Sequence, residues 1–214
     1  ACIDASVGHY VGIVGQSSQT ACTAGTYQEI TGQSSCDDAS AGYYVDASLG
    51  TGQISQTACA TGTYNPNTGS TSQSACQDAS AGYYVDASLG TGQSSQTACS
   101  AGTYNPNTGS TSSSACQDAS AGHYVDAALG TGQFSQTACS FGTYNPNTGS
   151  TSPSACVDAS PGHYVDSALG TGQASQTACA TGTYNPNTGS ASPSACQDAS
   201  AGHYVDSSLG TGQS

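Results

Sequence analysis

Hydrophobic residues in this chain stand in short clusters, and none of these clusters follows the 3.6-residue period of an α-helix. Gly or Pro interrupts every stretch long enough for a helix. Brief β-favouring runs, such as Tyr83-Tyr84-Val85 and the residues around Tyr104, lie between turn formers. The pattern therefore predicts short strands and turns, and no helix.

The turns have a chemical basis. In Asn105-Pro-Asn-Thr-Gly109 the proline presets φ at the second turn position, while Asn and Gly tolerate positive φ. Leu89-Gly-Thr-Gly92 has the same role in the neighbouring stretch. We therefore expect each such stretch to form two short extended segments joined by a turn, with a cysteine near the end that closes them.

A Gly-x-Tyr motif recurs at a constant interval from Tyr44 onward, which defines a 20-residue unit. Such a period indicates a tandem array of one small unit, in which each copy packs against its neighbours. We expect a small disulfide-rich β fold, an elongated tandem-repeat rod or solenoid without a large core. The tyrosines predicted to form an aromatic spine are Tyr44, Tyr64, Tyr84, Tyr104, Tyr124, Tyr144, Tyr164, Tyr184 and Tyr204.

The 20-residue units alternate between two types, so two consecutive units make one full 40-residue repeat. One type contains Asn-Pro-Asn-Thr-Gly after its tyrosine, and the other contains Val-Asp. The first copy is degenerate, as terminal repeats often are. The predicted boundaries are 1–36 for this first repeat, then 37–76, 77–116, 117–156 and 157–196, with a partial repeat at 197–214.

Large aliphatic residues are too sparse for a conventional core, with Val45 and Leu49 typical of one repeat. Eleven cysteines at regular intervals predict disulfides in place of that core, each contributing about 3 kcal/mol by restricting the unfolded chain. Disulfides at this density place the protein outside the cytosol. We therefore expect an extracellular or cell-surface location.

Spacing alone leaves the disulfide pairing open. Bridges across the short cysteine intervals leave Cys2 without a partner, and bridges across the long intervals leave Cys196. The long-interval set would be Cys2–Cys22, Cys36–Cys59, Cys76–Cys99, Cys116–Cys139 and Cys156–Cys179. In either set one thiol has to pair outside the segment.

The chain has no Lys or Arg and 13 Asp and Glu residues, giving a formal net charge of −13. Without cationic side chains it has no means of neutralising phosphates, so nucleic acid and anionic membrane surfaces are excluded as partners. No stretch is long and apolar enough to predict a membrane span.

The segment from Cys99 to Cys116, with Gly102 and Tyr104 between them, resembles the cysteine-rich modules of TNF-receptor-like and ephrin-receptor-like ectodomains. Those modules open with Cys-x-x-Gly-x-Tyr and close with a cysteine about a dozen residues after the tyrosine. The resemblance covers alternate units, because Ala119 stands where the next opening cysteine would be. In that family the opening and closing cysteines pair. This implies the bridges Cys22–Cys36, Cys59–Cys76, Cys99–Cys116, Cys139–Cys156 and Cys179–Cys196, with Cys2 pairing outside the segment.

Catalytic and metal-binding patterns are weak. The four histidines, His9, His123, His163 and His203, precede the tyrosine of the Val-Asp units, where other copies have Tyr, which indicates an aromatic packing position. No nucleophile, P-loop or Rossmann pattern is present, so we expect no enzyme and no cofactor. The cysteines lack a Cys-x-x-Cys pair, and their spacings do not suit zinc. Carboxylates and turn carbonyls can hold calcium, yet two aspartates eight residues apart are fewer ligands than a calcium loop supplies. The aspartates concerned are Asp78, Asp86, Asp118 and Asp126.

Ser/Thr-rich tracts beside the Asn-Pro turns are typical of O-glycosylation, with solvation of a flexible surface as the alternative. No Asn-x-Ser/Thr sequon exists, so any glycan is expected to be O-linked. The candidate sites are Thr68, Ser70, Thr71, Ser72, Thr108, Ser110, Thr111, Ser112, Thr148, Ser150, Thr151, Ser152, Thr188, Ser190 and Ser192.

Two functions fit these features. The first is a structural extracellular repeat protein that forms or decorates a filament by self-association, end to end or laterally, and carries O-glycans. The alternative is a receptor or adhesin stalk that presents a ligand-binding surface. The position after Gly-Gln varies among the repeats, as Ile54, Ser94, Phe134 and Ala174, and is the candidate for such contacts.

Overall fold

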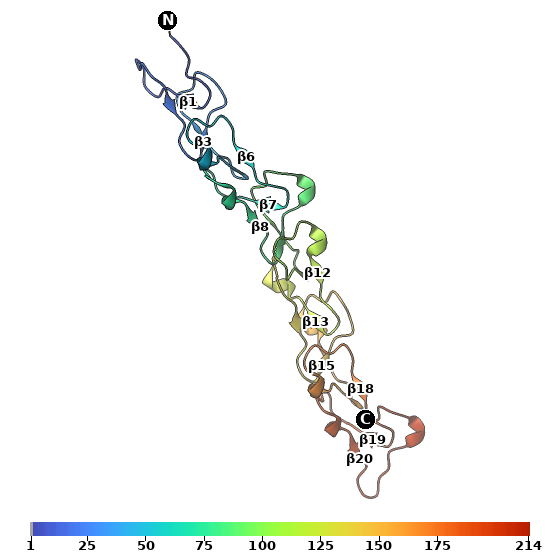
Figure 1. Ribbon diagram of the computed structural model, residues 1–214. Helices are drawn as coiled ribbons and strands as arrows, with labels where there is room; N and C mark the ends of the chain where they lie inside the picture. The colour runs from blue at the N-terminus through green and yellow to red at the C-terminus, as the bar shows by residue number, and fades with distance from the viewer. Residues whose placement is uncertain (1) are drawn as a thin grey trace. The chain divides into compact units, whose positions relative to one another are not determined.

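The computed structural model describes residues 2–214 and consists of two-stranded antiparallel hairpins built from the repeated units (Figure 1). No α-helix occurs within these residues. The described residues divide into two groups, 2–98 with Asn107–Ala115 and Cys99–Pro106 with Cys116–Ser214. The predicted fold class, a disulfide-rich tandem repeat of short strands and turns, is confirmed.

The Asn-Pro units form one kind of hairpin, named disulfide hairpins after the bond that closes them. Both strands have two residues, and Thr-Tyr pairs with a strand that ends in Asp. These strand pairs are β3 (Thr26–Tyr27) with β4 (Asp37–Asp38), β7 (Thr63–Tyr64) with β8 (Gln77–Asp78), β11 (Thr103–Tyr104) with β12 (Gln117–Asp118), β15 (Thr143–Tyr144) with β16 (Val157–Asp158) and β19 (Thr183–Tyr184) with β20 (Gln197–Asp198).

The Val-Asp units form the other kind, named glutamine hairpins after the side chain that closes them. Here His-Tyr or Tyr-Tyr pairs with Thr-Ala. The pairs are β1 (His9–Tyr10) with β2 (Thr20–Ala21), β5 (Tyr43–Tyr44) with β6 (Thr57–Ala58), β9 (Tyr83–Tyr84) with β10 (Thr97–Ala98), β13 (His123–Tyr124) with β14 (Thr137–Ala138) and β17 (His163–Tyr164) with β18 (Thr177–Ala178).

Single turns of 3₁₀-helix lie in the hairpin loops, where the sequence predicts simple turns. In the glutamine hairpins an aspartate caps the turn, as when the Ala128 backbone N–H donates to the Asp126 carboxylate. These turns are η1 (Ala47–Leu49), η3 (Ala87–Leu89), η5 (Ala127–Leu129), η7 (Ser167–Leu169) and η9 (Ser207–Leu209). The turns before closing cysteines are η2 (Gln73–Ala75), η4 (Ser113–Ala115), η6 (Pro153–Ala155) and η8 (Pro193–Ala195).

The buried apolar residues are few and small. Val85 packs with Ala79 and Tyr64, and the leucine of the same loop, Leu89, is 70% exposed. The other fully buried positions hold the counterparts of Val85 and Ala79 in the other repeats, the opening cysteines and the asparagines that follow the Thr-Tyr strands. Polar and covalent links therefore replace most of the packing that a larger core would supply.

Five disulfides close the hairpins of the first kind, with Cα atoms 5.5–5.7 Å apart. They join the short-interval pairs that the family resemblance implies. The remaining cysteine, Cys2, is exposed and unpaired within the described residues. The bridges are Cys22–Cys36, Cys59–Cys76, Cys99–Cys116, Cys139–Cys156 and Cys179–Cys196.

A glutamine side chain closes the other hairpins at the corresponding position. Ala119, fully buried, occupies the place of an opening cysteine, and Gln136 that of a closing one. The Gln136 Oε1 atom accepts a 2.7 Å hydrogen bond from the Ser120 backbone N–H. The same bond recurs at 2.7 Å in the other four glutamine hairpins, as Gln19 to Ser6, Gln56 to Ser40, Gln96 to Ser80 and Gln176 to Ser160.

In several glutamine hairpins the glycine before the first strand is required by conformation and by space. Gly122 has φ of 82°, and a Cβ built on it would collide with the Gly172 carbonyl oxygen of the next glutamine hairpin. Gly42 meets Gly92 in the same way within the other group of residues. Alternate hairpins thus approach each other through bare backbone, which only glycine permits.

We predict that Gly122→Ala destabilises its hairpins far more than Gly130→Ala. Both glycines have positive φ, near 82–84°, so both variants carry a conformational cost of about 1–3 kcal/mol. Only Gly122 faces another backbone, because nothing lies within 4 Å of a Cβ at Gly130. The added clash should cost about 1–3 kcal/mol more, measured by amide hydrogen exchange in residues 119–138. Equal effects of the two variants would contradict the close approach.

We also predict that the double variant Ala119→Cys, Gln136→Cys forms a sixth disulfide. The two positions have the register of Cys139 and Cys156 in the following hairpin, so no backbone movement is required. Oxidation should remove two hydrogens by mass spectrometry and stabilise the hairpin by roughly 3 kcal/mol. The control, Gln136→Ala, should destabilise it by about 1 kcal/mol. Persistent free thiols in the double variant would show that the two closures are not equivalent.

Candidate functional site

The junction between a glutamine hairpin and the following disulfide hairpin is the most regular polar contact in the chain. At one such junction the Gly122 N–H donates to Asn145 O at 2.7 Å, and the Val125 N–H to Ser150 O at 2.9 Å. Two further backbone bonds follow, Ala127 N–H to Thr151 O at 2.9 Å and Gly149 N–H to Ala119 O at 2.7 Å.

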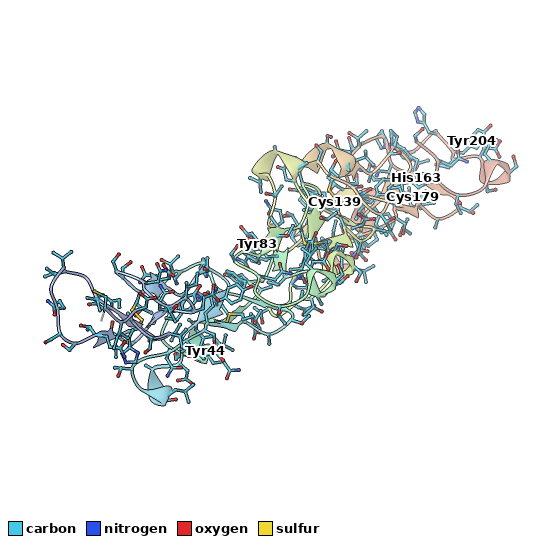
Figure 2. The ribbon with its side chains drawn as sticks, turned by 90° about the horizontal axis from the view of Figure 1, so that it is seen from above. Tyr44, Tyr83, Cys139, His163, Cys179 and Tyr204 are labelled. Atoms are coloured by element: carbon cyan, nitrogen blue, oxygen red, sulfur yellow. A yellow bond between two sulfur atoms is a disulfide. The ribbon has the colours of Figure 1, made fainter. Side chains whose placement is uncertain are left out.

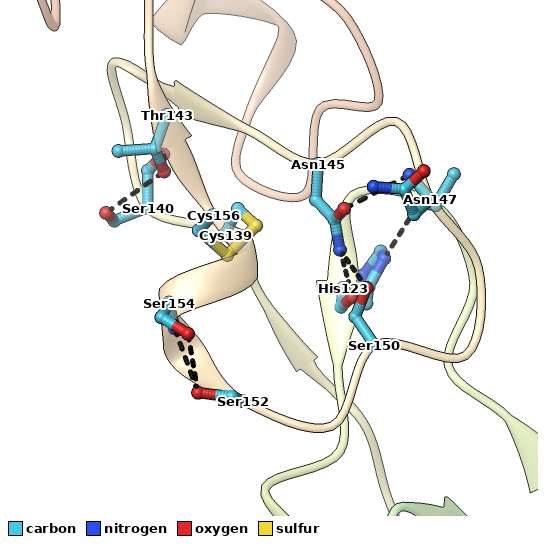
Figure 3. Close-up of a disulfide and its surroundings, with 11 residues drawn as sticks. His123, Cys139, Ser140, Thr143, Asn145, Asn147, Ser150, Ser152, Ser154 and Cys156 are labelled. Carbon is cyan, nitrogen blue, oxygen red and sulfur yellow. Dashed lines mark hydrogen bonds between the residues drawn. A yellow bond between two sulfur atoms is a disulfide. The ribbon is translucent and has the colours of Figure 1, made fainter.

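Asn145 adds a fifth bond from its side chain and organises the turn behind it (Figure 3). It is fully buried, and its Nδ2 donates to His123 O and to Ser150 Oγ, each at 2.9 Å. Its Oδ1 accepts from the Asn147 backbone N–H at 3.1 Å. The amide therefore uses both donors and its acceptor, so its burial carries no unpaired polar group.

The same five bonds recur at corresponding junctions in each group of residues. Between β5–β6 and β7–β8 they involve Asn65, whose Nδ2 donates to Tyr43 O at 2.8 Å. Between β17–β18 and β19–β20 they involve Asn185, whose Nδ2 donates to His163 O at 2.8 Å. The junction is thus a repeated unit of recognition, built from backbone groups and one asparagine.

The opposite junction, from a disulfide hairpin to the next glutamine hairpin, has fewer hydrogen bonds. The Asn145 N–H donates to Gln173 O at 3.1 Å, and the Gly172 N–H to Cys139 O at 2.9 Å. A parallel bridge between Tyr and Gln accompanies this pattern at three copies, Tyr64 with Gln93, Tyr104 with Gln133 and Tyr184 with Gln213. The two junctions of each 40-residue repeat therefore differ in their number of hydrogen bonds.

The residue before the tyrosine packs on a glycine of the next glutamine hairpin. A Cβ at Gly172 would lie 2.8 Å from His123 Cε1, and one at Gly92 would lie 2.8 Å from the Tyr43 hydroxyl. Because Tyr and His occupy the same place, the position has the packing role that the sequence indicates. Tyr64 is 9% exposed, whereas Tyr204 is 85% exposed, so the aromatic spine of the following tyrosines stays a prediction. The side chain of Tyr204 is labelled in Figure 2.

The aspartates considered for calcium are divided between two settings. Asp86 and Asp126 cap 3₁₀ turns, whereas Asp78 and Asp118 lie exposed at the ends of β8 and β12. Within residues 2–214 no group of three or more His, Cys, Asp or Glu side chains is placed to hold a metal ion.

Hydrogen bonds and burial shift a few pKa values. The Ser88 hydroxyl and its backbone N–H donate to Asp86 and lower the pKa of that carboxyl, and Ser48 and Ser208 lower the pKa of Asp46 and Asp206 likewise. Burial, followed by the nearby charges of Glu29 and Asp37, raises the pKa of Tyr27. These shifts have ordinary structural causes, and none marks a catalytic group.

The candidate glycosylation sites differ in accessibility, which the sequence does not reveal. The Thr68 side chain and its counterparts Thr108, Thr148 and Thr188 are exposed at the tips of the Asn-Pro turns. Ser70, Ser150 and Ser190 are half-buried, and their hydroxyls accept bonds from the buried asparagines. Ser152 and Ser192 are engaged by Ser154 and Ser194. The exposed threonines are therefore the most open to modification.

The sequence analysis did not predict two kinds of residue that organise the hairpins and their junctions: the buried asparagines and the closing glutamines. The available signal was positional: asparagine follows the Thr-Tyr strand in four copies, and glutamine precedes Thr-Ala-Cys in five.

No segment that the structure describes is a helix of the length and apolarity that a membrane crossing requires.

Comparison with models of known protein families and with curated protein sequences finds no match to this chain. The resemblance to receptor-type cysteine-rich modules therefore stays a resemblance. The junction geometry carries the functional argument.

We predict that Asn145→Ala weakens its junction by about 1–3 kcal/mol, because His123 O and the Asn147 N–H lose their buried partner. Amide exchange at Gly122 and Val125 should accelerate by roughly tenfold or more. The matched control is Asn147→Ala, where the exposed side chain is removed and the backbone bond remains. Similar exchange in both variants would rule out the buried amide as the organiser of the junction.

Proposed function

We propose that the chain is a structural extracellular repeat protein that forms or decorates a filament and carries O-linked glycans. The observation that carries this proposal is the open-ended junction. Within each of the two groups of residues, a hairpin receives its successor through one surface and docks on its predecessor through a different one. Head-to-tail contacts of this kind propagate indefinitely unless the geometry closes them into a ring.

The composition supports the same function. Filaments outside the cell gain durability from disulfides, and each 40-residue repeat contains one. A chain with no cationic side chain and a net charge of −13 is well hydrated along its length. The exposed threonines of the Asn-Pro turns recur once per repeat, so O-glycans there would coat the protein at regular intervals.

Cryo-electron microscopy of the natural, unreduced material tests the proposal. We expect continuous fibres whose axial repeat corresponds to one 40-residue double unit, with additional density at Thr68, Thr108, Thr148 and Thr188. Short isolated particles with bare threonine side chains would overturn both the filament and the glycan coat.

The second candidate, a receptor or adhesin stalk, is favoured by one local feature. Phe134 and Phe141 are 63% and 56% exposed, and the other copies have no aromatic residue at either position. Large exposed aromatic residues often anchor protein contacts. If Phe134→Ser and Phe141→Ser abolish binding to a partner that the natural material captures, while fibres are absent, the stalk becomes the better description.

A further inference from the structure

Three exposed positions around the Cys139–Cys156 hairpin hold larger or more apolar residues than their equivalents in three other repeats. Phe134, Phe141 and Val157 are 63%, 56% and 43% exposed. We propose that these three residues, named the Phe-Val surface, are a docking site for a short basic segment of another protein, in which apolar side chains alternate with Lys or Arg. The proposal goes beyond the filament function and does not depend on it. The equivalent residues are Ile54, Ser94 and Ala174 for Phe134, Thr61, Ala101 and Thr181 for Phe141, and Gln77, Gln117 and Gln197 for Val157.

The fold does not require these apolar side chains. In the preceding disulfide hairpin Gln117 takes the place of Val157, and the strand register and the disulfide Cα separation of 5.5 Å are the same. The polar residue therefore supports the same structure as the apolar one. Large exposed aromatic side chains often anchor protein contacts, so their concentration in a single repeat indicates contact with another molecule.

The three side chains lie within reach of one short extended segment. The Gly142 carbonyl oxygen accepts a 2.9 Å hydrogen bond from the Ala159 N–H, which joins the stretch that contains Phe141 to the stretch that contains Val157. Phe134 stands seven positions before Phe141, so their Cα atoms are at most about 25 Å apart. A fully extended segment of about eight residues spans about 27 Å.

The turn that carries Phe141 is fixed by hydrogen bonds and by packing. The backbone N–H and the hydroxyl of Thr143 both donate to Ser140 O, at 3.2 and 2.8 Å. Gly142 has φ of 77°, and a Cβ built on it would collide with the Gly189 carbonyl oxygen of the next disulfide hairpin. Because the turn is ordered before binding, docking on Phe141 would cost little backbone freedom on this side.

Uncompensated carboxylates lie beside the Phe-Val surface and define the chemistry of the partner. Asp158 follows Val157 in β16 and is exposed, and the Asp118 carboxyl carbon lies 3.7 Å from a Cβ built at Gly149 of the same hairpin. Neither carboxylate faces a Lys or Arg, because the sequence contains none. A second copy of the chain would bring a further net charge of −13, whereas a basic segment would neutralise the carboxylates. Charge complementarity therefore favours the basic segment.

A synthetic peptide of about this length, with alternating Leu and Lys, is the probe, and the ¹⁵N-labelled 214-residue chain is the receptor. One control peptide has Ser in place of each Leu, and another has Glu in place of each Lys. The exposed residues of the preceding repeat are an internal control, namely Ser94, Ala101 and Gln117. The matched triple variant of the receptor introduces those same residues and should fold as the native chain does, because the preceding repeat tolerates them. Its substitutions are Phe134→Ser, Phe141→Ala and Val157→Gln.

We expect the Leu-Lys peptide to shift the amide resonances of the Phe-Val surface, with an affinity at least about tenfold higher than at the internal control residues. The Ser-Lys and Leu-Glu peptides should bind the surface at least about tenfold more weakly than the Leu-Lys peptide. In the triple variant the preference for this repeat should disappear. Equal shifts in all repeats, equal binding of either control peptide, or a preference that persists in the triple variant would overturn the proposal.

The reverse substitutions test whether the three residues are sufficient. Ser94→Phe, Ala101→Phe and Gln117→Val together should create a second site and raise the stoichiometry from one to two peptides per chain. A stoichiometry that stays at one would count against the surface as the binding determinant.

Sedimentation without peptide distinguishes a second copy from a basic partner. If the native chain sediments as a dimer and the triple variant as a monomer, the Phe-Val surface pairs with itself and the proposed partner is wrong. A native chain that sediments as the triple variant does supports the basic segment as the occupant. Because the probe binds a single chain, the result is independent of whether natural material forms filaments.

Discussion

The need to pair backbone polar groups governs this structure more than the burial of apolar surface. A hairpin with two-residue strands satisfies few of the N–H and C=O groups in its own unit. The remaining groups find partners in the next hairpin, through bonds such as Val125 to Ser150 and Gly149 to Ala119. An isolated hairpin of this size is marginal in water, so each copy depends on its neighbours for a complete set of hydrogen bonds.

The hairpins alternate between two kinds of closure at their base. Both kinds of hairpin have the same strand register at their base, yet one is closed by a covalent bond and the other by the side chain of a glutamine. The alanine at position 119 is fully buried and cannot form a covalent bond, and the Gln136 side chain instead reaches back to the Ser120 backbone N–H. The resemblance to receptor-type modules covers alternate units because only those units retain the cysteine pair.

Sequence reasoning predicted the period, the short strands and the absence of an α-helix, since these depend on neighbouring residues. The strands at Tyr83–Tyr84 and Thr103–Tyr104 lie within the β-favouring runs. The roles of Asn145 and Gln136 were not predictable, because their partners lie 22 and 16 residues away along the chain. Leu89 and Val85 are both large aliphatic residues of the same loop. Only the three-dimensional structure shows that Leu89 is exposed and Val85 is buried. The Asn-Pro turn was predicted from local chemistry, whereas its docking on His123 was not.

The unequal closures have a mechanical consequence. Under tension a disulfide hairpin keeps its loop, because its base is covalently locked. A glutamine hairpin is held at its base by one pair of two-residue strands and one side chain, so it opens first and releases the chain between Ser120 and Gln136, which are 16 positions apart. That length of chain extends to roughly 55 Å. Each 40-residue repeat thus contains a fixed link in series with an extensible one, so a long array would yield stepwise under load and recover when the load is removed.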